Sequence, residues 1–181
     1  MMPEQKLLEQ ARLLDEGALA EIYDRYSDEL YRYSLRLLGD VQLSEDCVMD
    51  SFSRFLKALH RGGGPDRYLR AYLYRIAHNW ITDHYRRRAN QESPLDMAFP
   101  AASDQDPAAA LQGKAERELL RRGLLALTAD QRFVITLKFL EGWTNEEIAE
   151  TLGKQVGAVK GLQHRGIESL QRMIRVSEEK I

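Results

Sequence analysis

The spacing of apolar and polar positions predicts a chain that is almost entirely helical. Apolar residues recur at intervals of three and four, and no window shows the strict alternation expected of a half-buried strand. The first apolar stripe lies between Gly17 and Leu38, and Gly39-Asp40 would end that helix, because glycine commonly follows a helix C-terminus. The stripe consists of Leu19, Ile22, Tyr26, Leu30, Tyr33 and Leu37.

Two further helices are expected in the first half of the chain. One runs from about Ser44 to Leu59, and its predicted buried edge consists of Val48, Phe52, Phe55 and Leu59. The glycine-rich segment from Arg61 to Asp66 excludes regular structure, and a long helix follows from about Asp66 to Arg88. The predicted core edge of that helix consists of Leu69, Leu73, Ile76, Ala77 and Trp80.

The segment from Ala89 to Gly113 differs in composition from what surrounds it. It holds three of the five prolines and four acidic residues, with no basic residue. This composition is typical of a linker, so we place two domains at 1–88 and 114–181, joined by an acidic, flexible linker at 89–113. The expected fold class is therefore all-α, with two small helical domains.

The second domain carries the pattern of a helix-turn-helix. The segments Thr128–Gln131 and Thr144–Glu147 both fit the capping box, and the second opens a short helix that Gly153 ends. The next helix has an apolar side made of Val159, Leu162, Gly166, Leu170 and Met173. Its opposite side carries Lys160, Gly161, His164 and Arg165.

The charge of this last helix favours nucleic acid as its ligand. From Lys154 to Arg175 there are five basic residues and one acidic residue, Glu168. A basic amphipathic helix alone could be an ordinary solvated surface. Together with the short capped helix and the glycine turn, it predicts binding in a groove of duplex DNA.

The helix from Asp66 to Arg88 has a composition that suits single-stranded DNA. From Arg61 to Arg88 there are seven arginines and two aspartates, interleaved with Tyr68, Tyr72, Tyr74, Trp80 and Tyr85. Basic groups follow the phosphate backbone and aromatic faces stack on exposed bases. One edge of the helix presents Tyr72, Arg75, Asn79, Thr82 and Arg86. The glycine loop before it could approach an unpaired base closely, or could be a plain interhelical turn.

Residues 127–170 are similar to region 4 of the sigma-70 family of RNA polymerase subunits. The resemblance rests on the Leu127–Arg132 opening and on Phe139–Gly142, Glu147–Ala149, Val156–Lys160 and His164-Arg165. It implies that the −35 promoter element is bound as duplex by Lys154, Gln155, Lys160, Gly161, His164 and Arg165. Gln155 stands where a capping Ser is common, and Gly161 and Leu162 replace residues that are often Ser and Arg, so the exact −35 sequence stays open.

The first domain resembles region 2 of the same family. Residues 43–59 are similar to region 2.2, which implies that Asp46, Asp50, Ser53 and Arg54 contact the core polymerase. Residues 66–88 are similar to regions 2.3 and 2.4, through Tyr72–Ala77 and Asn79. That similarity implies contacts with the melted −10 element by Tyr68, Tyr72, Arg75, Asn79 and Arg86, with an unpaired base captured by the loop at 61–68. Regions 2 and 4 without a third domain between them resemble the group 4, or extracytoplasmic-function (ECF), sigma factors.

The composition indicates the cellular compartment of the protein and argues against a metal site or a catalytic site. The chain has 181 residues, a net charge of −2, one cysteine and no apolar run near the roughly 20 residues of a membrane span. We therefore expect a cytoplasmic protein with no membrane insertion and no signal peptide. His60, His78, His84 and His164 lack metal-ligand spacing relative to Cys47, and there is no phosphate-binding loop or nucleophile elbow. We expect no metal, no cofactor and no catalytic activity of the chain itself, and we expect Cys47 in the core.

The sequence thus predicts a sigma factor that binds core RNA polymerase and directs promoter-specific initiation. The resemblance adds an anti-sigma protein to the expected partners, beside core polymerase and promoter DNA. The alternative is a stand-alone helix-turn-helix regulator that binds an operator as a dimer, which would need a ligand or phospho-acceptor domain before the helix-turn-helix. A third alternative is a helical adaptor whose basic helix makes only protein contacts. That alternative does not explain the arginine and tyrosine residues between Arg61 and Arg88.

Overall fold

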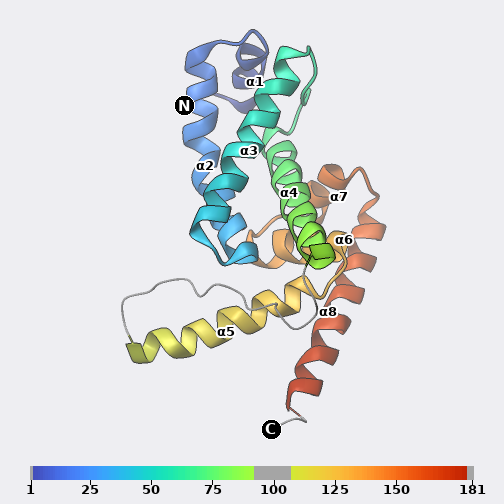
Figure 1. Ribbon diagram of the computed structural model, residues 1–181. Coiled ribbons are helices and arrows are strands. Elements are labelled where there is room, and N and C mark those ends of the chain that lie inside the picture. The colour runs from blue at the N-terminus through green and yellow to red at the C-terminus, as the bar shows by residue number, and fades with distance from the viewer. Residues whose placement is uncertain (1, 92–106, 179–181) are drawn as a thin grey trace. The chain divides into compact units, whose positions relative to one another are not determined.

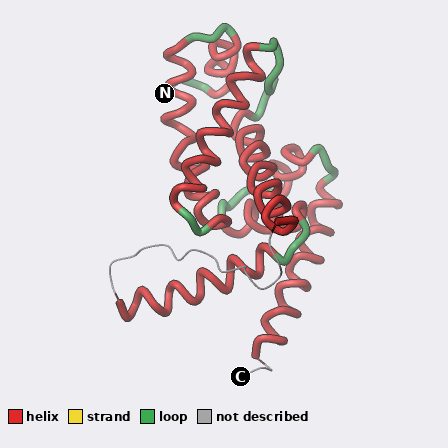
Figure 2. Tube along the Cα trace, viewed as in Figure 1, coloured by secondary structure: helices red, strands yellow, loops and turns green. Residues whose placement is uncertain are grey.

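The computed structural model describes residues 2–91 and 107–178, and every regular element in those two ranges is helical (Figures 1 and 2). The chain divides into two compact units, Met1–Phe99 and Pro100–Ile181. Helices enter both ends of the expected linker, because α4 continues to Gln91 and α5 begins at Pro107. The middle of that linker, 92–106, lies outside the described residues. No helix of the described ranges is both long enough and apolar enough to cross a membrane.

Between residues 2 and 91 the first unit contains four helices, α1 (Glu4–Arg12), α2 (Glu16–Leu38), α3 (Val41–His60) and α4 (Leu69–Gln91). The α2 helix ends at Gly39, whose φ of 67° is the left-handed conformation that glycine adopts freely. The α3 helix begins three residues before the predicted Ser44, because the carboxylate of Asp40 accepts the Leu43 backbone N–H at 2.8 Å and caps it there. In Figure 1 α2 and α3 run side by side, and α4 packs against both.

The α1 helix is absent from the sequence prediction. It buries Leu7, Leu8 and Ala11 almost completely against the rest of the first unit. An apolar stripe of three residues in a nine-residue helix is too short for periodicity to stand out, so its place was decided by tertiary packing.

The core of the first unit confirms one predicted edge and corrects the other. The four predicted residues of α3 are buried, with exposures between 1% and 7%. On α4 Leu69, Leu73 and Ala77 are buried as predicted, whereas Ile76 and Trp80 are only half-buried. Tyr74 and Ile81 are fully buried in their place, because α4 is covered by both α2 and α3 and so turns a wider surface inward.

The second unit contains α5 (Pro107–Leu125), α6 (Ala129–Ile135), a π-helical turn η1 (Thr136–Leu140), α7 (Asn145–Leu152) and α8 (Val156–Glu178). Both predicted capping boxes are present, with reciprocal hydrogen bonds between Thr128 and Gln131 and between Thr144 and Glu147. Gly153, with a φ of 61°, ends α7 as predicted. The π-helical turn was not predicted, since no single-residue signal marks the extra residue that it accommodates.

Candidate nucleic-acid and protein interfaces

The α7–α8 pair is a helix-turn-helix that side-chain contacts hold at the start of α7 and in the turn between the helices. Gln163 Nε2 on α8 donates to Asn145 Oδ1 on α7 at 2.7 Å, which links the second helix to the start of the first. Lys154, in the turn between them, pairs with Asp130 of α6 at 3.3 Å. Val159 of α8 is fully buried, so this face of the helix points toward the core of the unit.

The predicted −35 residues lie on the α8 surface away from that core and on the turn before it. Lys154, Gln155, Lys160, His164 and Arg165 are exposed, and Gly161 is half-buried. The carbonyl of Gln155 accepts the Ala158 and Val159 N–H groups at 2.9 and 3.2 Å, so the helix begins where the sequence predicted. His164 Nδ1 lies 3.5 Å from a carboxylate oxygen of Glu168, the acidic residue one turn later. Glu168 is thus an acidic neighbour of His164 on a helix that is otherwise basic on its outer surface.

On α4 the structure divides the predicted −10 residues by exposure. Arg75 and Asn79 are exposed along the helix, while Tyr72 is half-buried with its ring 6.1 Å from the ring of Phe55. Arg86 is exposed and pairs with Asp83 at 3.0 Å. Tyr68, just before the helix, is 48% exposed and has a φ of 58°, which is rare for a non-glycine residue.

The interleaved aromatic residues do not form one uniform stacking surface. Tyr74 is fully buried, with its ring 5.0 Å from that of Tyr33, and so is unavailable to a base. The Tyr85 hydroxyl donates to the Leu37 carbonyl at 2.8 Å and ties α4 to the end of α2. Trp80 is half-buried and stacks on His84 at 5.5 Å. Tyr68 is exposed and Tyr72, Trp80 and Tyr85 are half-buried, so part of each of these four rings remains accessible.

The predicted core-polymerase residues lie on the outer side of α3. Asp46 and Arg54 are exposed, Asp50 and Ser53 are half-buried, and Arg54 Nε donates to Asp50 Oδ2 at 2.6 Å. This i,i+4 ion pair lies at the surface, so its contribution to stability is small, about 0.3–0.5 kcal/mol. Met49, between the two aspartates, is 61% exposed.

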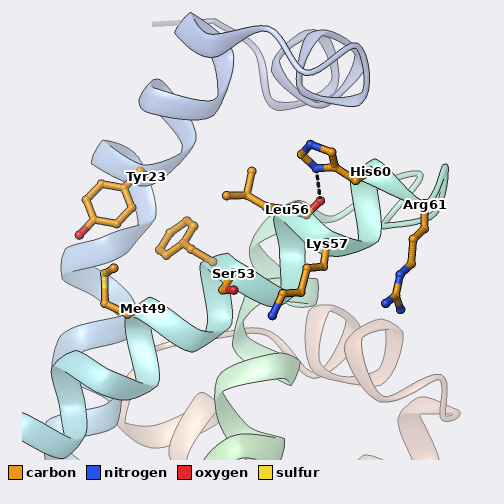
Figure 3. A pocket seen from close by; sticks show the side chains of 8 residues that line it. Tyr23, Met49, Ser53, Leu56, Lys57, His60 and Arg61 are labelled. Carbon is orange, nitrogen blue, oxygen red and sulfur yellow. Dashed lines mark hydrogen bonds between the residues drawn. The ribbon is translucent and has the colours of Figure 1, made fainter.

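An open pocket of about 460 Å³ adjoins this surface, and sequence reasoning missed it (Figure 3). It is lined by Tyr23, Met49, Phe52, Ser53, Leu56, Lys57, His60 and Arg61. Tyr23 comes from α2 and its ring lies 4.9 Å from that of Phe52 on α3, so the pocket depends on the packing of two helices. The α3 surface therefore combines carboxylates, an apolar hollow and the basic residues at its C-terminal end.

Cys47 is fully buried, as predicted, and burial raises the pKa of its thiol to about 11. The thiol therefore stays protonated and weakly nucleophilic at neutral pH. Within 2–91 and 107–178, no group of three or more His, Cys, Asp or Glu side chains is arranged to hold a metal ion.

Comparisons with known proteins match both units. Residues 22–91 match the family model "Sigma-70 region 2", and residues 117–170 match "Sigma-70, region 4". The chain is 30% identical to the ECF RNA polymerase sigma factor SigL of Mycobacterium tuberculosis over 164 residues, covering 89% of this chain and 91% of SigL. It is 29% identical to SigW of Bacillus subtilis over 180 residues, covering 94% and 96% of the two chains.

Three further matches are a longer relative and two solved structures. The chain is 29% identical to the ECF sigma factor BldN of Streptomyces coelicolor over 171 residues, and the match spans 93% of this chain and 65% of BldN. CnrH, solved in complex with the cytosolic domain of CnrY, is 25% identical with a TM-score of 0.69, covering 96% of this chain and 97% of that one. The sigma factor RpoE of Bartonella quintana, solved with the anti-sigma factor NepR, shares the fold at 24% identity and a TM-score of 0.59, covering 87% and 96%.

Proposed function

This chain belongs to the sigma-70 family, in the ECF group, and from that membership we propose that it binds core RNA polymerase and directs initiation at specific promoters. The observation that carries the proposal is the presence in one chain of a region 2 unit with an arginine- and tyrosine-rich helix and a region 4 unit with a basic helix-turn-helix. The two units would contact two separate promoter elements.

The region 4 unit would read the −35 element as duplex DNA through α8. Lys160 and Arg165 supply positive charge for phosphates, and the exposed side chains of Gln155 and His164 can donate or accept hydrogen bonds at base edges. Lys154 would reach the phosphate backbone from the turn. The Gln163–Asn145 contact supports this role, because it fixes the angle at which α8 leaves α7.

The region 2 unit would hold the melted −10 strand along α4. Arg75 and Arg86 would follow the phosphates, and Asn79 would make a polar contact with a base edge. Tyr68 and Tyr72 present ring surface at the N-terminal end of the helix, next to the 61–68 loop that would receive an unpaired base. Capture of that base would offset the cost of unstacking it, a few kcal/mol.

The outer side of α3 would dock on the core polymerase. Asp46 and Asp50 provide negative charge, while Ser53 and Arg54 add hydrogen-bonding groups. We extend this surface to the pocket beside Met49, because an apolar hollow flanked by charge has the composition of a protein-binding surface. The polymerase would supply all the chemistry of RNA synthesis.

We also propose regulation by an anti-sigma protein in the cytoplasm. The support is the fold shared with CnrH, which was solved in complex with the cytosolic domain of CnrY. A partner that covers α3 or α8 would exclude the polymerase or the promoter from those surfaces.

The test combines the purified full-length chain with sigma-free core polymerase and a randomised duplex DNA library. We expect a stable complex with core, and transcripts that start at a common sequence with two conserved elements. Failure to bind core, or transcription without sequence selection, would overturn the proposal. Binding of one symmetric operator by a dimer without core would instead identify a stand-alone regulator.

A further inference from the structure

Helix α1 lies before the segment matched by region 2, residues 22–91, yet it contacts the loop before α4 and the first residue of α4. At its C-terminal end Arg12 Nη2 donates to the Pro65 carbonyl at 3.0 Å and pairs with the carboxylate of Asp66. At its N-terminal end Glu4 Oε1 accepts the Leu69 backbone N–H at 3.1 Å. The 61–68 loop is therefore held to α1 near its middle and directly after its last residue.

The second carboxylate oxygen of Glu4 fixes this contact to the core of the unit. It accepts a hydrogen bond from the hydroxyl of Tyr26 at 2.7 Å. Tyr26 lies on α2 and is only 5% exposed. Burial raises the pKa of that hydroxyl, and the hydrogen bond to Glu4 raises it further, so Tyr26 remains a donor throughout the physiological range. Glu4 thus connects the first amide of α4 to α2.

The loop that α1 holds has an unfavourable backbone at the residue nearest the DNA-facing helix. Its φ angles are positive at Gly62, Gly64 and Tyr68, with values of 70°, 98° and 58°. Glycine adopts this conformation freely, but tyrosine does so only where its surroundings hold it. Glu4 bonds the amide of Leu69, the very next residue, and thereby restrains the peptide unit that sets the direction of Tyr68.

The α1 helix is itself well seated, so it can serve as a fixed reference. Leu7, Leu8 and Ala11 are buried with exposures of 0% to 1%. Before the helix, the Met2 backbone N–H donates to Glu21 at 3.0 Å and its carbonyl accepts Arg25 at 2.7 Å. The Arg12 contact with the loop and the Glu4 contact with α4 both form within the protein alone.

We propose that α1 is a positioning element for promoter melting, in which Glu4 and Arg12 hold the 61–68 loop and Tyr68 in the conformation that receives an unpaired −10 base. The proposal rests on the proposed function of the region 2 unit. It gives Glu4 and Arg12 a role without contact to DNA: they act through the Leu69 amide and the Pro65 carbonyl. Their loss should affect melting while duplex −35 binding and core binding stay unchanged.

The test uses the full-length chain bound to core polymerase and a duplex promoter that the wild-type holoenzyme selects from a randomised library. Glu4→Gln removes a charge with little change of shape, and Arg12→Gln removes a charge and shortens the side chain. Arg12→Lys is the conservative variant, and Lys6→Gln is the matched control on the exposed side of α1. Hydrogen exchange of residues 61–69 reports the loop, and permanganate oxidation of unpaired thymines reports melting. Core affinity, −35 duplex affinity and the midpoint of thermal unfolding are measured in parallel.

We expect faster exchange of the loop in Arg12→Gln and Glu4→Gln, and melting reduced by about threefold to fivefold, as suits a partly exposed charged contact. Arg12→Lys should recover part of the loss, and Lys6→Gln should match the wild type. Unchanged exchange of the loop, or faster exchange with normal melting, would overturn the inference. A uniform loss of core binding, −35 binding and thermal stability would also overturn it, since α1 would then only support the fold. A wild-type chain that neither binds core nor selects a promoter would count against the proposed function instead.

Discussion

The guanidinium of Arg165 lies against Gly161, one turn earlier on α8: a Cβ built at Gly161 would come within 3.4 Å of Arg165 Nη1. Glycine inside a helix lowers stability by about 1 kcal/mol relative to alanine. At this distance a methyl group on residue 161 would make ordinary van der Waals contact with the flexible guanidinium. Gly161 and Arg165 are therefore direct neighbours on the DNA-facing surface of α8.

Gly161→Ala should separate stability from DNA recognition. We expect the free energy of unfolding to rise by about 1 kcal/mol, because alanine is the better helix former. The same change places a methyl group against the guanidinium of Arg165 on the DNA-facing surface, and it should reduce discrimination between the selected −35 element and a mutated one. Denaturant unfolding and duplex binding by fluorescence anisotropy measure the two effects. If Gly161→Ala has the same effect on discrimination in an Arg165→Ala background, the two residues are not coupled and this explanation fails.

Lys160→Ala and Arg165→Ala should each weaken binding of −35 duplex DNA. Each should also make the binding affinity less sensitive to salt concentration. Each lost phosphate contact lowers the slope of log affinity against log salt concentration by about 1. Arg122→Ala is the matched control, since Arg122 is an exposed arginine of the same unit that pairs with Glu118 on α5. An equal change of slope in the control would mean that net charge, rather than the α8 surface, controls binding.

Asn79→Ala should impair open-complex formation and preserve −35 affinity. Asn79 is exposed on α4 in the region 2 unit, so its change should leave the α8 surface untouched. The loss of one good base contact corresponds to about 1–3 kcal/mol. Permanganate footprinting measures the melted fraction, and anisotropy with −35 duplex provides the internal control. Equal defects in both assays would refute the division of labour between the two units.

Charge reversal at Asp46 and Asp50 should weaken binding to core polymerase and leave folding intact. Asp46→Lys removes an exposed carboxylate, and Asp50→Lys also breaks the surface ion pair with Arg54, a loss of a few tenths of a kcal/mol. Asp28→Lys, at an exposed site on α2, is the control for charge, since it changes the net charge by as much as either single variant. Core affinity by titration and helicity by circular dichroism are the measurements. Wild-type affinity in the double variant would remove this face of α3 from the interface.

Gly166→Ala and Gly157→Ala should have opposite effects on stability, although both lie in α8. A Cβ at Gly166 would stand 2.9 Å from Ile135 Cγ1 at the crossing of α8 and α6, so we expect a loss of about 1–3 kcal/mol. At Gly157 a Cβ meets nothing within 4 Å, so we expect a gain of up to about 1 kcal/mol. Urea unfolding of the two variants measures both. A stable Gly166→Ala protein would indicate that α6 and α8 can separate at small cost.

Local sequence signals predicted the elements that are determined locally. The two capping boxes and Gly153 define the helix-turn-helix, because caps and left-handed glycines act through neighbouring backbone groups. The α1 helix escaped prediction for the opposite reason. Its three buried residues are stabilised by packing on other helices, and its polar ends bond to residues 65, 66 and 69.

The candidate interfaces show the same limit. The faces of α3 and α8 could be assigned by helical periodicity, since each belongs to a single helix. The pocket on α3 could not, because Tyr23 reaches it from α2. The role of Tyr74 was also misjudged: composition placed it among base-stacking aromatics, whereas contact with Tyr33 buries it completely. A list of residue types on a helix does not say which of them the neighbouring helices cover.

The burial of Cys47 makes the natural chain almost equivalent to a cysteine-free background for chemical labelling. Its thiol is inaccessible and stays protonated near neutral pH, whereas a cysteine introduced at an exposed position would react readily with maleimides. A cysteine introduced at position 49 on α3 or at position 157 on α8 can therefore carry a single fluorophore without replacement of Cys47. Each of the surfaces described above becomes open to direct optical measurement in an otherwise unaltered protein.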